Sequence, residues 1–470
     1  MTAIDLAPQS SPQWQQGALV DLSIDDLTDG GDGVGRWQDR PVFVPDTVPG
    51  DRVRVRLVFT KPRFGRGAVV ELLDPSRDRV RPPCIVADKC GGCQWQPVSY
   101  EAQLAAKERQ AIEALRRIGG FIDPPVAPIL AAPSPLNYRN KVTYPIAAGP
   151  DGQVRAGYYR KGSHKLVNLN RCPIQDERFD PLLSYFKDEI QALDWRPYDE
   201  ETHQGQIRHI SFRIGRRTGE MLVTLVSREP ELPELEVRSR RWLDEVPNLV
   251  GVFLNVNPQR GNRIFGEDTY IVAGREYILE RLGDLEFRMG PDTFFQVYTE
   301  QAEAMIAAIA TQLDLKGHET VVDAYCGVGT LALPLAKRAA RVIGIEVQGP
   351  ALDWAQFNAR RNDLNNTKFH EGTVEEKLPE ILAGLAAADA PADVVVLDPP
   401  RRGCQPEVIA ALREAMPQRI VYMSCKPATL ARDLERLCAD GLYRLVMVQP
   451  ADFFPQTPHV ECAAFLERSP

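Results

Sequence analysis

The 470-residue sequence lacks any long apolar run and any leader-like N-terminus. No stretch approaches the roughly 18 apolar residues that mark a membrane-spanning helix. The N-terminus has neither the basic nor the apolar segment of a signal peptide. Net positive charge is also absent, because 64 acidic residues outnumber 56 lysines and arginines. These absences predict a cytoplasmic protein without a membrane partner, in which any nucleic-acid binding depends on locally gathered cations.

Several cores are possible in a chain of this length with 44% apolar residues, and the pattern changes along it. Residues 1–15, rich in Gln, Ser and Pro, predict a flexible arm. Residues 16–74 alternate in short runs between Gly- and Pro-rich turns, which is typical of a small five-stranded barrel. Residues 75–290 hold a Cys-rich link, a helix and short strands, and predict a central α+β domain. In residues 291–470 strands alternate with helices, which predicts a doubly wound parallel α/β sheet.

Positive charge does gather in one stretch of the predicted barrel, "DRVRVRLVFTKPRFGRG". The stretch contains one acidic residue, Asp51, and six basic residues, which are Arg52, Arg54, Arg56, Lys61, Arg63 and Arg66. Taken alone, the stretch fits a solvated strand face as well as a nucleic-acid contact.

Nine cysteines are unevenly spaced, which favours metal binding or catalysis over a disulfide framework in a cytosolic chain. Cys84, Cys90 and Cys93 form a C-x5-C-x2-C series, and Cys172 follows at a distance. Four thiolates at such positions suit an iron–sulfur cluster or zinc. A chance grouping is the remaining interpretation.

A glycine-rich turn follows the first strand of the predicted α/β sheet. In "VVDAYCGVGT" the strand ends at Asp323, and Gly327 and Gly329 allow a ligand to approach the backbone. The next strand ends at Glu346, where an acid can bind the hydroxyls of a ribose. The glycines alone fit NAD, FAD or S-adenosylmethionine, or an ordinary turn. Asp323 favours S-adenosylmethionine, because a carboxylate repels a pyrophosphate but attracts a sulfonium.

Two later strand ends carry reactive groups at the same predicted edge. Asp398 begins "DPPRRG", in which Arg401 replaces the aromatic residue that amino-methylating enzymes place after the prolines. Cys425 lies between the end of an apolar strand and a Lys-Pro pair, where Lys426 and a following helix would favour the thiolate. A thiolate there can add to C6 of a pyrimidine and make C5 a nucleophile. A buried, inert cysteine is the alternative.

Such a reaction also needs a base to remove the C5 proton. Glu461 lies in an apolar strand close to His459, and an acid is costly to bury there without a purpose. The alternatives are an edge-strand Glu and a core His.

Taken together, these motifs resemble the RNA 5-methyluridine methyltransferase family (RumA/TrmA type). The matching residues are "FFQV" (294–297), "DAYCGVGT" (323–330), "GIE" (344–346), "LDPPRRG" (397–403), "SCKPATLARD" (424–433) and "FPQTPHVE" (454–461). The resemblance implies a Rossmann-like class I methyltransferase domain over residues 291–470, with Cys425 as nucleophile and Glu461 as general base. It also implies a pocket for S-adenosylmethionine and uracil lined by Gln296, Tyr325, Thr330, Glu346 and Asp398. Tyr298 and Lys426 depart from the family, whose members commonly have Asn at both positions.

The resemblance extends to the first half of the chain. Residues 16–74 look like a TRAM domain, an RNA-binding barrel of the OB type, which favours a functional role for the basic stretch. Cys84, Cys90, Cys93 and Cys172 resemble the family's 4Fe-4S site, with zinc as the alternative. Both features are similar to the branch that methylates uridine in 23S ribosomal RNA, whereas the transfer-RNA branch lacks both. We therefore expect a monomeric enzyme with ribosomal RNA as its partner.

Four other functions compete with this interpretation. A transfer-RNA uridine methyltransferase would share the chemistry, and a non-catalytic RNA-binding or assembly protein would be expected to lose the nucleophile or the base. A radical methylthiotransferase requires a C-x3-C-x2-C triad, which is absent. A DNA cytosine methyltransferase usually places Pro before its cysteine, where this chain has Ser424.

Overall fold

The computed structural model describes residues 13–470, so residues 1–12 of the predicted arm lie outside the described residues. The chain forms two compact units. One contains the chain up to Ala106 together with Gln456–Pro458, and the other contains Lys107–Pro455 and His459–Pro470.

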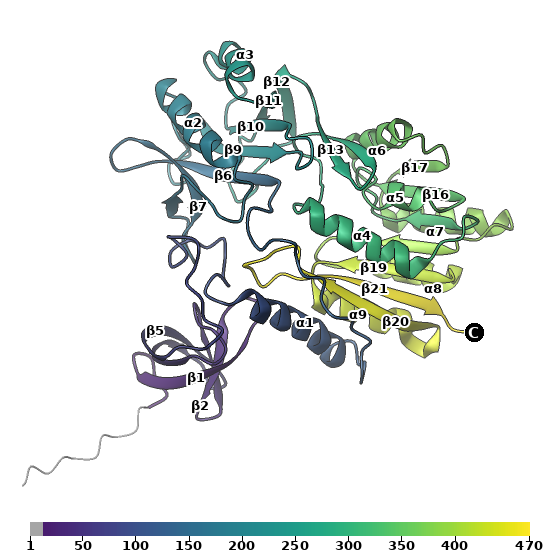
Figure 1. Cartoon of the computed structure of the whole chain (residues 1–470), viewed down its shortest axis with the longest axis horizontal. Helices are drawn as coiled ribbons and strands as arrows, with labels where there is room; N and C mark the ends of the chain where they lie inside the picture. The colour runs from purple at the N-terminus through teal and green to yellow at the C-terminus, as the bar shows by residue number, and fades with distance from the viewer. Residues whose placement is uncertain (1–12) are drawn as a thin grey trace, which may run out of the picture. The chain divides into compact units, whose positions relative to one another are not determined.

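The first unit is built on a closed five-stranded barrel, which confirms the predicted architecture (Figure 1). The strands, in the order β1-β2-β3-β5-β4 around the barrel, are β1 (Leu19–Leu27), β2 (Gly33–Trp37), β3 (Arg40–Val44), β4 (Arg52–Thr60) and β5 (Gly65–Asp74). Alternation explains β4: Val53, Val55 and Leu57 are fully buried in the barrel, and the arginines between them face outward. The barrel therefore forms because apolar residues recur at every second position.

Trp14, which we predicted to lie in a flexible arm, is fixed to the barrel instead. Its ring stacks on Trp37 with centroids 5.9 Å apart, and its Nε1 donates a hydrogen bond to the carbonyl of Lys61 at 2.8 Å. The guanidinium of Arg40 lies 5.2 Å from the same ring. A large aromatic side chain gains more from this packing than from exposure to water, and the sequence pattern did not show it.

The basic stretch is partly neutralised within the barrel. Arg54 pairs with Asp21 at 2.8 Å and with Glu71 at 3.1 Å, and Arg66 pairs with Asp32 at 3.2 Å. Among residues 13–470, no ion pair involves the other four cations, which are Arg52, Arg56, Lys61 and Arg63. The positive charge available to a ligand is therefore smaller than the sequence suggests.

Helix α1 (Tyr100–Arg117) confirms the helix predicted after the Cys-rich link. The boundary between the two units falls inside it, between Ala106 and Lys107. Its early residues pack in a small core around Trp95, and Ala111 and Leu115 join a core of the second unit. The single helix therefore contributes to the hydrophobic cores of both units.

The second unit begins with a seven-stranded sheet of order β12-β11-β10-β9-β6-β7-β8. Its strands are β6 (Lys141–Ala148), β7 (Val154–Tyr159), β8 (Leu166–Asn168), β9 (Ile207–Ile214), β10 (Met221–Ser227), β11 (Leu249–Val256) and β12 (Asp268–Gly274). The same part of the chain forms the helices α2 (Phe179–Ala192) and α3 (Leu235–Glu245). A hairpin of β13 (Ile278–Leu282) and β14 (Leu285–Met289) follows the sheet.

A second seven-stranded sheet, of order β17-β16-β15-β18-β19-β21-β20, forms the α/β domain. Its strands are β15 (Thr320–Asp323), β16 (Arg341–Glu346), β17 (Thr367–Glu371), β18 (Val394–Leu397), β19 (Arg419–Ser424), β20 (Tyr443–Ala451) and β21 (Glu461–Arg468). The first five run parallel, as predicted. The last two are antiparallel to their neighbours, which corrects the prediction of a wholly parallel sheet. Parallel strands need a long crossover connection, usually a helix, and no helix lies between β20 and β21.

Helices cover both faces of this sheet. They are α4 (Thr299–Leu313), α5 (Ala332–Ala336), α6 (Gly349–Arg361), α7 (Val374–Ala387), α8 (Pro406–Ala415) and α9 (Pro427–Cys438), with a short 3-10 turn at Ala439–Gly441. Successive strand residues alternate between two cores, so that Val321 packs with α4–α6, whereas Val322 packs with α7–α9 and α1. The strand order reverses between β15 and β18, where open α/β sheets bind ligands.

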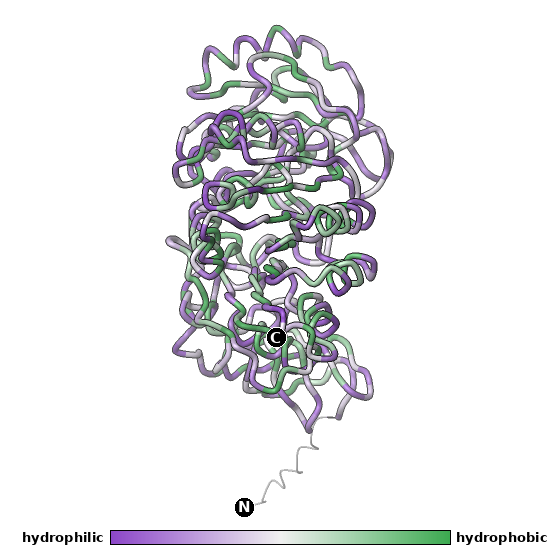
Figure 2. The backbone as a smooth tube through the Cα atoms, turned by 90° about the vertical axis from the view of Figure 1, so that its right-hand side faces the viewer, coloured by the Kyte–Doolittle hydropathy of each residue, from purple (hydrophilic) through white to green (hydrophobic). Residues whose placement is uncertain are grey.

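No helix within residues 13–470 is long and apolar enough to cross a membrane. Figure 2 shows short hydrophobic and hydrophilic segments alternating along the coloured chain.

Candidate functional site

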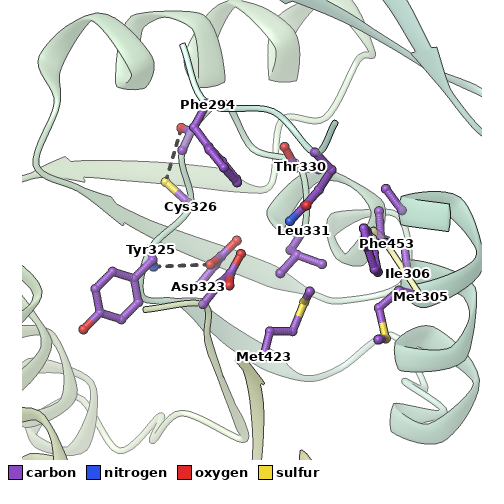
Figure 3. Close-up of a pocket in the computed structure, with 14 residues that line it drawn as sticks. Phe294, Met305, Ile306, Asp323, Tyr325, Cys326, Thr330, Leu331, Met423 and Phe453 are labelled. Carbon is purple, nitrogen blue, oxygen red and sulfur yellow. Dashed lines mark hydrogen bonds between the residues drawn. The ribbon is translucent and has the colours of Figure 1, made fainter. Parts of the chain in front are cut away.

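A pocket opens where the strand order of the α/β sheet reverses (Figure 3). It contains about 480 Å³ of space, counted with the open space at its mouth. Six of the residues singled out in the sequence line it, namely Gln296, Asp323, Tyr325, Gly327, Thr330 and Asp398. The sheet therefore brings together motifs that lie up to a hundred residues apart, as parallel strands do at their carboxyl ends.

Positive φ angles at Gly327 (+52°) and Gly329 (+91°) shape the turn that forms one wall. A side chain at position 329 would also place its Cβ 2.8 Å from Leu333. The turn is fastened by Glu346, whose Oε2 accepts a hydrogen bond from the Gly327 N–H at 3.0 Å. Its other oxygen accepts one from the Gln348 N–H at 2.8 Å. Glu346 thus lies beside the turn, as the sequence predicts, but is not among the residues that line the pocket.

Asp323 is the most unusual group in the pocket wall. Its carboxylate is fully buried, and its Oδ2 has no hydrogen-bond partner. Burial, together with the nearby charge of Asp398, raises the pKa of Asp323 to about 7. Burial likewise raises the pKa of Asp398 to about 6. A buried carboxylate oxygen that faces a pocket without a hydrogen-bond partner is stabilised by a cationic ligand, so the wall fits the ammonium or sulfonium group of S-adenosylmethionine.

Cys425 and Glu461 meet at the same edge of the sheet. Cys425 follows β19 directly and precedes α9, for which Lys426 is the N-cap. Glu461 is the first residue of β21, which pairs with β19 in a register that places Ser424 opposite Cys462. Glu461 therefore lies opposite the position of Cys425. The sequence predicted both residues, and the structure brings them together.

Burial and neighbouring negative charge disfavour ionisation of both groups. The pKa of Cys425 is raised, first by burial and then by the charge of Glu461. The pKa of Glu461 is raised well above its usual range, first by burial and then by Asp398. Arg401 opposes both shifts. In the sequence Arg401 was only an argument against amino methylation, and its effect on the thiol emerges from the structure.

The loop that carries Arg401 is attached to α9. The hydroxyl of Thr429 donates to the Arg401 carbonyl at 3.3 Å, and the Cys404 N–H donates to the Asp433 carboxylate at 3.0 Å. Gly403 has a φ of +80°, and a Cβ there would lie 2.4 Å from Asp433 Oδ2. Glycine is therefore needed for the loop to approach the helix this closely.

The two departures from the family pattern lie outside the pocket. Lys426 is exposed, and Arg401, not Lys426, is the cation that lowers the pKa of Cys425, which corrects the role we predicted for Lys426. Tyr298 is buried, and its ring stacks on Tyr138 with centroids 4.8 Å apart. Its hydroxyl donates to the Ser134 carbonyl at 2.8 Å. Tyr298 thus anchors the segment before α4 and does not line the pocket.

An exposed aromatic residue that does line the pocket is Phe294. Phe294 is 68% exposed, although Phe295 beside it is buried. Figure 3 shows the Phe294 ring among the pocket residues. The "FFQV" motif drew attention to this segment in the sequence, but we assigned a role only to Gln296. Apolarity alone did not show which phenylalanine faces out.

A buried ion pair holds the segment that leads toward Glu461. Lys107 Nζ lies 2.5 Å from Asp452 Oδ1, and neither side chain is exposed. Lys107 also donates to the Phe454 carbonyl at 3.0 Å, and the Tyr138 hydroxyl donates to the Pro455 carbonyl at 3.1 Å. Farther along, burial followed by the charge of Arg401 lowers the pKa of His459. His459 therefore stays neutral near neutral pH.

The cysteines predicted to bind a cluster are divided between the two units. Cys84, Cys90 and Cys93 belong to the first, and Cys172 belongs to the second. Within residues 13–470 no three His, Cys, Asp or Glu side chains are arranged to hold a metal ion. The Cys90 sulfur accepts the Gly92 N–H at 3.4 Å, which suits a thiolate. The metal site stays a prediction.

Arg401→Met should raise the pKa of the Cys425 thiol. Loss of a neighbouring cation should move the rate of iodoacetamide alkylation, plotted against pH, to higher pH by about one unit. Mass spectrometry of the peptide that contains Cys425 separates this thiol from the other eight. Arg402→Met is the matched control, because it removes the adjacent exposed arginine. Identical profiles for Arg401→Met and the wild type would contradict the assignment.

Comparison with known proteins agrees with this geometry. The family model for tRNA (uracil-5-)-methyltransferase matches residues 255–469, and the TRAM domain model matches residues 13–70. An uncharacterized RNA methyltransferase of Nostoc sp. is 57% identical over 96% of this chain and 97% of its own length. One from Halalkalibacterium halodurans is 40% identical over 96% of this chain and 97% of its own length.

A solved structure shares the architecture of both units. The tRNA (uracil-54, C5)-methyltransferase of Pyrococcus abyssi, in complex with S-adenosyl-L-homocysteine, is 27% identical. It has a TM-score of 0.75, over 95% of this chain and 100% of the other. With a full-length relative at 57% identity, a matching family model and this fold, the chain belongs to the RNA (uracil-5-)-methyltransferase family and is an S-adenosylmethionine-dependent RNA (uracil-C5)-methyltransferase with an N-terminal TRAM domain.

Proposed function

We propose that this enzyme methylates C5 of a uridine through a covalent bond between Cys425 and C6 of the base. The observation that supports the proposal most is the meeting of Cys425, Glu461 and Arg401 at one edge of the sheet, where the charge of Asp398 from the pocket wall also acts on Cys425 and Glu461. Uracil C5 is a weak nucleophile until a thiolate has added to C6, so the reaction needs a cysteine at this place. It also needs a base that acts later.

Each residue has one task in the proposed reaction. The Cys425 thiolate, stabilised by Arg401, forms a bond to C6, and the electron pair of the C5–C6 double bond moves toward O4. S-adenosylmethionine, when bound, supplies the methyl group that C5 takes up. The Glu461 carboxylate then removes the C5 proton, and the returning electrons break the bond between sulfur and C6. The pKa of Glu461 is raised by burial, which makes its carboxylate a stronger base.

We assign the cofactor to the wall that contains Asp323. Its buried oxygen without a partner suits a positive charge, and Gln296, Tyr325, Thr330 and Asp398 line the same pocket. Glu346 fixes the glycine turn, and we assign it to the ribose hydroxyls, as the family resemblance implies.

Substitution of the nucleophile and of the base should separate the two halves of the reaction. Cys425→Ala should abolish methyl transfer and leave no link between protein and RNA. Glu461→Gln should lower turnover by about a hundredfold or more, yet accumulate an adduct that survives denaturing electrophoresis, because the thiol adds but cannot leave. Cys438→Ala, which removes a half-buried thiol at the C-terminal end of α9, should behave as wild type. Transfer that persists in Cys425→Ala would contradict the mechanism.

We infer that the substrate is 23S ribosomal RNA. The support is the family resemblance of the four cysteines to the branch that acts on this RNA. The barrel does not distinguish the substrates, because a tRNA methyltransferase shares the architecture of both units. Transfer RNA is the second candidate, because the Pyrococcus abyssi protein that shares the fold of this chain acts on uracil-54 of tRNA.

Transfer of labelled methyl from S-adenosylmethionine to unmodified ribosomal RNA and transfer RNA, assayed separately, distinguishes the two. We expect labelled 5-methyluridine in ribosomal RNA only. Label in transfer RNA alone would keep the chemistry and overturn the substrate. A different labelled nucleoside would overturn the chemistry.

We further propose that Cys84, Cys90, Cys93 and Cys172 hold a 4Fe-4S cluster. The cluster would be structural. Protein purified without oxygen should contain about four iron atoms and four sulfides, and Cys172→Ser should lose most of both. Zinc with no iron would favour the alternative ligand.

A further inference from the structure

We propose that the tip of the β4–β5 hairpin is a stacking site for unpaired bases of the RNA. The site, which we call the hairpin platform, consists of Phe59, Lys61, Arg63 and Phe64. The inference rests on the proposed function, because it requires an RNA substrate. It names the barrel residues that would bind unpaired nucleotides other than the reacting uridine.

Two phenyl rings are exposed at this tip. Phe59 is 40% exposed and Phe64 is 38% exposed, and their centroids lie 6.0 Å apart at an interplanar angle of 48°. Phe64 also meets Phe43 edge to face at 6.0 Å. The interior of the barrel is filled by other side chains, namely five valines, two leucines and an isoleucine. Neighbouring exposed aromatic rings are uncommon on a protein surface unless they contact a partner.

The tip is held in place before any ligand binds. Lys61 donates its backbone N–H to the Phe64 carbonyl at 2.8 Å and closes the loop. The Lys61 carbonyl accepts from Trp14 Nε1 at 2.8 Å, and the Pro62 carbonyl accepts from Arg40 Nε at 3.2 Å. A fixed loop loses little conformational entropy when it binds, which favours affinity.

Cations surround the rings. Lys61 Nζ lies 5.5 Å from the centre of the Phe59 ring, and Arg63 is exposed next to Phe64. Within the described part of the chain neither forms an ion pair, in contrast to Arg54 and Arg66 of the same hairpin. Lys61 and Arg63 at the tip therefore remain available to bind an anionic ligand.

Aromatic faces beside cations match unpaired RNA. Bases stack on the rings, and phosphates contact the lysine and the arginine, a combination typical of single-strand binding on barrels of this type. Base-paired RNA hides its base faces in the helix and would meet only the cations. An apolar peptide would match the rings but would leave the cations without partners. Unpaired RNA is the ligand that satisfies both.

The test uses the full-length protein and fluorescent oligoadenosine, which contains no uracil and cannot undergo the reaction. Phe59→Ala with Phe64→Ala should weaken its binding by about tenfold or more for each stacked base lost. Binding of an RNA duplex should change little. Leu72→Ala is the matched control, because Leu72 is also 40% exposed but lies opposite Val53, at the far end of the hairpin. Unchanged affinity for oligoadenosine in the double variant would overturn the proposal.

Lys61→Gln tests the phosphate contact separately. In a plot of the logarithm of affinity against that of salt concentration, the slope should become shallower by about 0.7 if one phosphate contact is lost. An unchanged slope would remove Lys61 from the platform.

Methyl transfer separates a failure of this inference from a failure of the proposed function. The double phenylalanine variant should keep the wild-type kcat on saturating RNA and show a raised KM. If the wild type forms no 5-methyluridine, the proposed function fails, whatever the platform does. If the wild type is active and the double variant binds and reacts like it, only the platform proposal fails.

Discussion

Three carboxylates are buried at one edge of a single sheet, and most of the site depends on how their charge is balanced. Asp323, Asp398 and Glu461 come from different strands, and burial raises the pKa of each. Arg401 is the cation that acts on Glu461 and on the neighbouring Cys425. Buried charges of one sign are tolerated when a ligand or a partner compensates them. The cationic cofactor and the arginine are therefore expected to stabilise the site as well as to serve the chemistry.

The antiparallel placement of β21 has a direct chemical consequence. In a parallel sheet the first residue of a strand lies at the edge opposite the ligand. Glu461 is the first residue of β21, and the reversed direction brings it beside the end of β19 and Cys425. The departure from a wholly parallel sheet thus places the base next to the nucleophile. The loop before it is tied to α1 by the buried pair of Lys107 and Asp452, and loss of one partner would leave a buried charge alone.

Sequence patterns predicted what depends on local order, and they failed where distant segments meet. Period-two alternation identified the barrel, and the strand–helix rhythm identified the α/β domain with Cys425 and Glu461 at its edge. The direction of β21 depends on pairing, which no local pattern records. Arg401 was undervalued because it is exposed and becomes important only where its loop folds back along α9. Trp14 lies in a segment of disordered composition, yet stacking on Trp37 and a hydrogen bond to the Lys61 carbonyl fix it.

Recognition and chemistry rely on different physical properties in the two units. The crevice uses burial, because a dry site strengthens the effect of Arg401 on a thiol. The barrel tip uses exposure, because a base can stack only on a ring that it can reach. Base stacking is tolerant of sequence, so a platform of this kind adds affinity without choosing a uridine. The choice of uridine must then come from the fold of the RNA and from the pocket that contains Phe294, Gln296 and Asp323. Substrate specificity should therefore respond to changes in the pocket and affinity to changes at the hairpin.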